Sequence, residues 1–155
     1  MHIAVMAALA FSALGGSAAA QDPVAGSVTP ISGKCSSLAV VGQDITADCA
    51  GTLLLGTDAD GRMIVGFLVT RGPGAIYFSG REEARDGVAV LRVDRIILVG
   101  PGDPKDTVIL GAGECRWGDF STGAARIICQ FVAEDGTPAT GAFETDGVAP
   151  GAIQP

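Results

Sequence analysis

The chain has 155 residues, ten basic and seventeen acidic, and its formal net charge at pH 7 is −7. An acidic surface repels phosphate backbones, which makes nucleic acid a poor partner, and no basic amphipathic helix is present to bind anionic membranes. The single histidine, His2, lies at the N-terminus, so the remainder of the chain lacks Ser-His-Asp chemistry and most catalytic metal sites.

The N-terminal segment reads as a secretory signal peptide over residues 1–20. Its apolar run, residues 3–14, is too short to span a bilayer, and Ala18-Ala19-Ala20 offers the small residues of a cleavage site. No second run reaches the roughly 20 apolar residues of a membrane helix. We therefore expect a soluble mature chain without stable membrane insertion, periplasmic or secreted, and the Ala-, Gly- and Arg-rich composition points to a bacterium.

The rest of the chain is expected to form a single domain. Residues 21–32 form a flexible lead-in, 33–147 one β domain, and 148–155 a flexible tail.

Taken in order, the domain begins with a strand at 37–41, a turn at 41–44, a return at 45–48 and an apolar strand at 51–56. The stretch 62–79 follows, two strands around Gly72-Pro73-Gly74 that are apolar on both faces and so should be covered on both sides. A charged connection, 81–87, leads to a long strand, 88–99, whose alternation requires a bulge near Asp94.

A loop at 100–106 precedes strands at 107–112, at 125–133 within a cysteine hairpin, and at 137–144. About eight short strands without a convincing helix predict an all-β fold, an antiparallel sandwich or small barrel.

Four cysteines, Cys35, Cys49, Cys115 and Cys129, form two pairs with the same spacing of 14 residues. In an exported chain an even cysteine count indicates disulfides, and pairing Cys35 with Cys49 and Cys115 with Cys129 closes each pair as a hairpin. Neither zinc spacing nor a C-x-x-C redox pair is present. The shared spacing indicates either a duplicated unit or recurring turn chemistry.

Catalytic and metal-binding alternatives have little support in the sequence. A carboxylate-dependent hydrolase of envelope glycans would need Asp94 with Glu82 or Glu83, but pairing of Asp94 with Arg92 or Arg95 and solvation of Glu82 and Glu83 explain these residues far better. Asp58-x-Asp60-Gly61 resembles the start of a calcium loop, yet a hairpin turn explains it better. We expect no enzyme activity, no cofactor and no metal.

Recognition is the function that the sequence favours. Arg116 and Trp117 beside Cys115, together with Arg92, Asp94 and Arg95, form the candidate interaction surface, because tryptophan and arginine are favoured interface anchors. The alternative for Trp117 is packing over its own disulfide in the core. The leading hypothesis is a non-enzymatic interaction or structural module with an envelope or extracellular protein partner; the runner-up is a small-ligand carrier with an apolar β interior.

Overall fold

The computed structural model describes residues 26–100, 105–120 and 123–148. Within these ranges the chain is almost entirely β-structure, with one short 3-10 turn, η1. The elements are β1 (Val28–Val40), β2 (Gln43–Asp44), η1 (Thr46–Asp48), β3 (Cys49–Thr57), β4 (Met63–Val69), β5 (Ala75–Arg85), β6 (Val88–Val99), β7 (Thr107–Trp117), β8 (Arg126–Ala133) and β9 (Pro138–Thr145).

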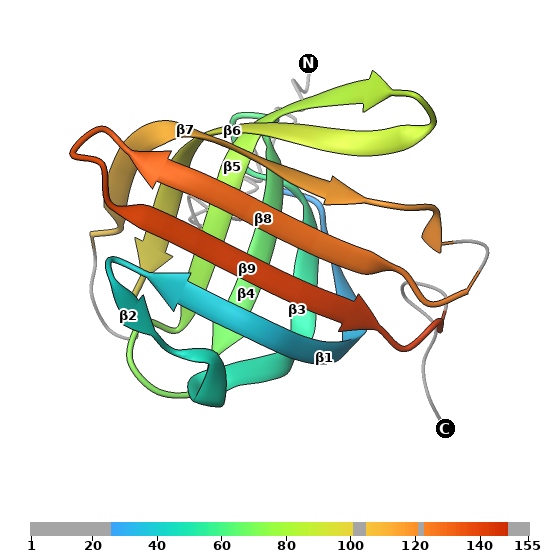
Figure 1. Ribbon diagram of the computed structural model, residues 1–155, viewed down its shortest axis with the longest axis horizontal. Helices are drawn as coiled ribbons and strands as arrows, with labels where there is room; N and C mark the ends of the chain where they lie inside the picture. Colours follow the sequence, from blue (N-terminus) through green and yellow to red (C-terminus); the bar gives the residue numbers. More distant parts are fainter. Residues whose placement is uncertain (1–25, 101–104, 121–122, 149–155) are drawn as a thin grey trace, which may run out of the picture.

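The strands close into an antiparallel barrel of eight strands, with β2 as one extra strand. Closure depends on β1, which pairs with β3 through Val28 to Ser32 and with β9 through Gly33 to Ala39. Figure 1 shows β1, β8 and β9 crossing in front of β3, β4 and β5 at a large angle. The all-β prediction is confirmed, and the structure decides for a barrel over a sandwich.

Side chains fill the barrel interior. Phe67, Phe78 and Phe143 are fully buried, and the rings of Phe67 and Phe78 meet edge to face with centroids 5.7 Å apart. Gly141 on β9 leaves room for Phe67, because a Cβ there would lie 2.6 Å from the Phe67 ring. The interior is therefore a packed core and not a chamber.

The outer face of the central strands carries a second buried cluster: Ile64, Ala75, Tyr77 and Ile97. These residues alternate with interior residues along β4, β5 and β6, as the pleat of a strand requires. The Tyr77 ring covers Gly66, where an added Cβ would lie 2.5 Å from a ring carbon. The prediction that the two strands within stretch 62–79 are covered on both faces is confirmed, while the turn between them is exposed at residues 70–72.

The β3–β4 turn is organised by Asp58, which is only 5% exposed. Its Oδ1 accepts hydrogen bonds from the backbone N–H groups of Asp60 and Arg62, at 3.0 and 2.9 Å. Its Oδ2 accepts one from Arg95 at 3.1 Å. Both Asp58 oxygens therefore have partners within the protein, and the predicted hairpin turn is present, since Thr57 pairs with Met63 across it.

Three sequence predictions about secondary structure need correction. Residues 45–48 are not a strand: the return strand, β2, ends at Asp44, Ile45 is the N-cap of η1, and residues 46–48 form η1. Residues 81–85 continue β5, and Asp86-Gly87, both with positive φ, make a two-residue hairpin turn in place of a longer connection. The barrel also begins earlier than predicted, since β1 starts at Val28 inside the expected lead-in.

The predicted bulge in β6 is present, because the register with β7 shifts between Val93 and Arg95. The predicted strands 107–112, 125–133 and 137–144 correspond to β7, β8 and β9, with β7 running on to Trp117. The predicted signal peptide, the lead-in up to residue 25 and the tail from residue 149 lie outside the described residues.

Both predicted disulfides are present, but they are not equivalent. Cys115 and Cys129 lie directly opposite each other on β7 and β8, as a hairpin requires, and both are fully buried. Cys35 instead lies opposite Phe143 of β9 and reaches Cys49 at the start of β3. This disulfide joins β1 to β3 beyond their shared ladder, so the first pair does not form the predicted symmetric hairpin.

No helix in the described ranges is long and apolar enough to cross a membrane.

Candidate functional site

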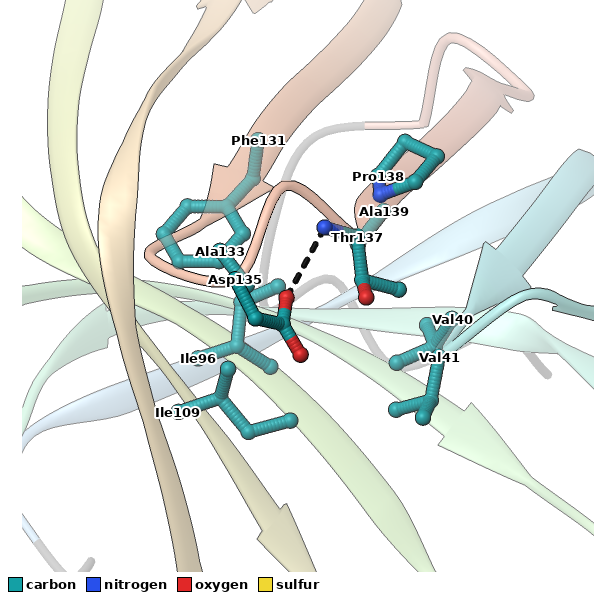
Figure 2. Close-up of a pocket in the computed structure, with 10 residues that line it drawn as sticks. All are labelled: Val40, Val41, Ile96, Ile109, Phe131, Ala133, Asp135, Thr137, Pro138 and Ala139. Carbon is teal, nitrogen blue, oxygen red and sulfur yellow. Dashed lines mark hydrogen bonds between the residues drawn. The ribbon is translucent and has the colours of Figure 1, made fainter.

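One end of the barrel opens into an apolar pocket of about 130 Å³, which we call the mouth pocket (Figure 2). Five regions of chain meet there: the end of β1 with its turn, the middle of β6, the start of β7, the end of β8, and the β8–β9 turn with the start of β9. The lining residues are Val40, Val41, Ile96, Ile109, Phe131, Ala133, Asp135, Thr137, Pro138 and Ala139.

The floor of the mouth pocket belongs to the barrel core. Ile96, Phe131, Ala139 and Val40 are all nearly fully buried and alternate with outward-facing residues on their strands. Because these side chains are fixed by core packing, the floor is rigid and apolar.

Val41 stands at the rim of the pocket and is 55% exposed. With Gly42 it forms the turn between β1 and β2, and both residues have positive φ, 53° and 73°. This left-handed conformation is costly for a β-branched residue, and Asn, Asp or Gly usually occupies such a turn. The chain therefore holds an exposed valine in a strained position beside an apolar pocket.

Asp135 supplies the one charged group of the lining. Its Oδ1 accepts a hydrogen bond from the Thr137 backbone N–H at 2.8 Å. That hydrogen bond, with a further one from the Thr137 hydroxyl, holds the pKa of Asp135 below its ordinary value, so the carboxylate is ionised at neutral pH. Figure 2 shows the second carboxylate oxygen pointing into the space between Ile109 and Val41.

A second apolar hollow of about 170 Å³, the side pocket, shares Val40 and Val41 with the mouth pocket. The turn between β1 and β2 therefore separates two adjacent apolar depressions. The remaining lining residues of the side pocket are Gln43, Ile45, Pro73, Ile76 and Leu98.

The apolar character continues onto the outer rim. Val108 and Leu110 flank Ile109 on β7, and Val132 lies between Phe131 and Ala133 on β8, and all three are about half exposed. Exposed valines and leucines gathered at a pocket edge are typical of a surface that contacts another molecule.

The sequence-predicted interaction surface is only partly assembled. Trp117 is 6% exposed and packs in the interior with the Cys115–Cys129 disulfide, so it is core and not an exposed anchor. Side chains alternate between the two faces of a strand, and Trp117 follows the inward-facing Cys115 by two residues, so both side chains lie on the same face.

The four charged residues of that prediction lie on the outer wall, each in an ion pair. Arg92 pairs with Glu83 at 3.1 Å, Asp94 with Arg62, Arg95 with Asp58, and Arg116 with Glu114. Of these, Arg92 and Asp94 line one open groove together with Glu114, while Arg116 lines a neighbouring depression.

The carboxylates considered for hydrolysis are not brought to one place. Glu83 and Asp94 share the outer groove, where arginines neutralise both, whereas Glu82 lines a different depression beside Asp60 and Arg62. In the described part of the chain, no three His, Cys, Asp or Glu residues gather in a way that could hold a metal ion.

The sequence did not predict the mouth pocket, because its walls come from five regions spread between Val40 and Ala139. Two local signals were present. An apolar residue precedes Gly42 in a hairpin turn that favours polar residues, and Asp135-Gly136-Thr137 follows an apolar strand.

Fold and site together define a closed, disulfide-linked antiparallel β-barrel with an apolar pocket at one end. The two disulfides are compatible with an oxidising extracellular or periplasmic location. Comparison with protein families, with curated proteins and with solved structures finds no match.

Proposed function

We propose that this protein is a non-enzymatic interaction module of the bacterial periplasm or cell exterior, and that the barrel mouth is its recognition surface. The predicted signal peptide and the two disulfides support that compartment, because disulfides persist in oxidising environments. The barrel then serves as a rigid scaffold for its loops and turns.

The volume of the mouth pocket is the observation that carries the proposal. Pockets for small-molecule ligands usually measure about 300–1,000 Å³, whereas this one measures about 130 Å³. That volume accepts a single aliphatic side chain, which is how one protein anchors to another. The filled interior around Phe67 and Phe78 counts against the carrier hypothesis, since no described chamber lies beneath the pocket.

The absence of catalysis is part of the same proposal. The carboxylates of the outer groove are held in ion pairs with Arg62 and Arg92, and a glycan hydrolase needs one carboxylate free to donate a proton.

Crosslinking capture from an envelope extract of the source organism tests the proposal. The oxidised mature domain is compared with two variants, Val41→Asp at the mouth and Val88→Asp as a matched control. Val88 is also an exposed valine, at 39%, but it lies at the β5–β6 turn. Asp tolerates a left-handed turn better than Val does, so Val41→Asp should fold.

We expect native protein and Val88→Asp to capture the same abundant partner, and Val41→Asp to lose it. Equal capture by all three would refute the mouth as the recognition surface. A double variant, Arg92→Ala with Arg116→Ala, tests the outer wall as an alternative recognition surface. Loss of the partner in this double variant alone would place recognition on the outer wall.

A further inference from the structure

We infer that the barrel mouth recognises an aliphatic side chain with a cationic group beside it, as in a partner segment that carries Leu, Ile or Val next to Lys or Arg. The inference deepens the proposed function and rests on it for the identity of the partner as a protein. The mouth pocket itself supplies the chemistry.

The apolar half of the ligand follows from shape. A cavity of about 150 Å³ lined by aliphatic and aromatic side chains is known to hold benzene, and the mouth pocket is of similar size, about 130 Å³. Ile96, Ile109 and Phe131 offer no hydrogen-bonding side-chain group to a polar ligand atom. A branched chain of four or five carbons therefore fits the floor.

The cationic half follows from Asp135. Its Oδ1 accepts a hydrogen bond from the Thr137 N–H, and the Thr137 hydroxyl also donates to this carboxylate, which together fix it in place. Its other oxygen points into the space between Ile109 and Val41 (Figure 2). Among the ten lining residues there is no Lys, Arg or His. An ammonium or guanidinium at the rim can pair with this oxygen while the attached aliphatic chain fills the floor.

The charge of the whole molecule favours the same partner. A formal net charge of −7 steers cations toward the surface and repels anions. The side pocket adds an apolar position beyond the Val40–Val41 turn, so a neighbouring apolar residue of the same partner segment has a place to bind.

The conformation of Val41 is consistent with this use. A strained backbone conformation persists only where the surrounding structure enforces it, and such conformations are concentrated at functional sites. Asn or Gly at this turn would relieve the strain but remove an apolar wall shared by both pockets.

Two small probes of equal shape and opposite charge test the inference, 3-methylbutylammonium and 3-methylbutanoate. Each is titrated into the ¹⁵N-labelled mature domain at pH 7, and amide chemical shifts are followed. We expect the ammonium probe to shift amides around Ile109, Phe131 and Ala139 and to bind about fivefold more tightly than the carboxylate probe, as one exposed ion pair allows.

The Asp135→Asn variant should bind both probes about equally. Its side-chain oxygen can still accept the Thr137 N–H, so the turn is kept while the charge is lost. Val88→Asp is the control that adds a charge elsewhere and should retain the preference. Equal binding of the two probes to native protein, shifts remote from the mouth, or no binding would each overturn the inference.

The two proposals fail separately. If neither probe binds, but a partner is captured by native protein and lost in Val41→Asp, the interaction module stands and the inference of a cationic ligand is refuted. Charge-selective probe binding without any captured partner would support the site and refute the interaction module.

Discussion

Gly141 makes the space for Phe67 inside the barrel, and replacing this glycine with alanine tests the packing of the core. An added Cβ would lie 2.6, 2.9 and 3.2 Å from three carbons of the Phe67 ring. Carbon atoms pack at about 3.5–4.0 Å, so the ring must move by roughly 1 Å. Phe67 is fully buried and packs edge to face against Phe78, so a shift of its ring must disturb neighbouring core side chains.

Overpacking of this kind destabilises by about 1–3 kcal/mol. The lower backbone entropy of unfolded alanine offsets about 0.4–1 kcal/mol of that. We expect Gly141→Ala to lower the free energy of unfolding by about 1–2 kcal/mol. Gly118→Ala is the control, because an added Cβ there meets nothing within 4 Å and the variant should be unchanged or slightly stabilised.

Urea unfolding followed by fluorescence measures the effect. Trp117 is the sole tryptophan and lies buried in the core, so its emission reports loss of the barrel. A Phe67→Leu, Gly141→Ala double variant should be more stable than the sum of the single changes predicts, by about 1 kcal/mol. An unchanged midpoint in Gly141→Ala, or additive effects in the double variant, would refute this account of the core.

Three further outcomes are expected. Replacing Cys35 and Cys49 by serine opens a loop of about 15 residues and should lower stability by about 3 kcal/mol in urea; a loss below about 1 kcal/mol would contradict the role given to this disulfide. The lowered pKa of Asp135, caused by the Thr137 N–H, adds stability that is present above the unfolded pKa of about 3.9 and is lost as pH falls through the folded value. The free energy of unfolding of native protein should therefore fall more than that of Asp135→Asn between pH 6 and pH 2. Equal falls in the two proteins would contradict a stabilising role for the Asp135 carboxylate. Val41→Asn should raise stability by about 1 kcal/mol because it relieves a positive φ of 53°, while weakening binding of the ammonium probe; a fall in melting temperature would refute the strain.

Strands, turns and cysteine pairing could be predicted from the sequence because they rest on local rules. Apolar runs separated by a Gly-Pro-Gly turn identified the two strands of stretch 62–79, and the interrupted alternation along strand 88–99 located the bulge near Asp94. The equal spacing of 14 residues gave both disulfides. Local turn chemistry identified Asp60-Gly61 correctly, while Asp86-Gly87 carried the same signal and was missed.

Only the tertiary structure decided how the barrel closes and which surfaces it leaves open. Closure depends on β1 changing partners from β3 to β9 within one continuous strand, and no local pattern specifies a neighbour more than 100 residues away. The same closure turns Trp117 inward and gathers Val41, Ile109 and Asp135 at one mouth. Alternation along a strand tells which residues share a face, but long-range pairing decides whether that face is core, wall or binding site.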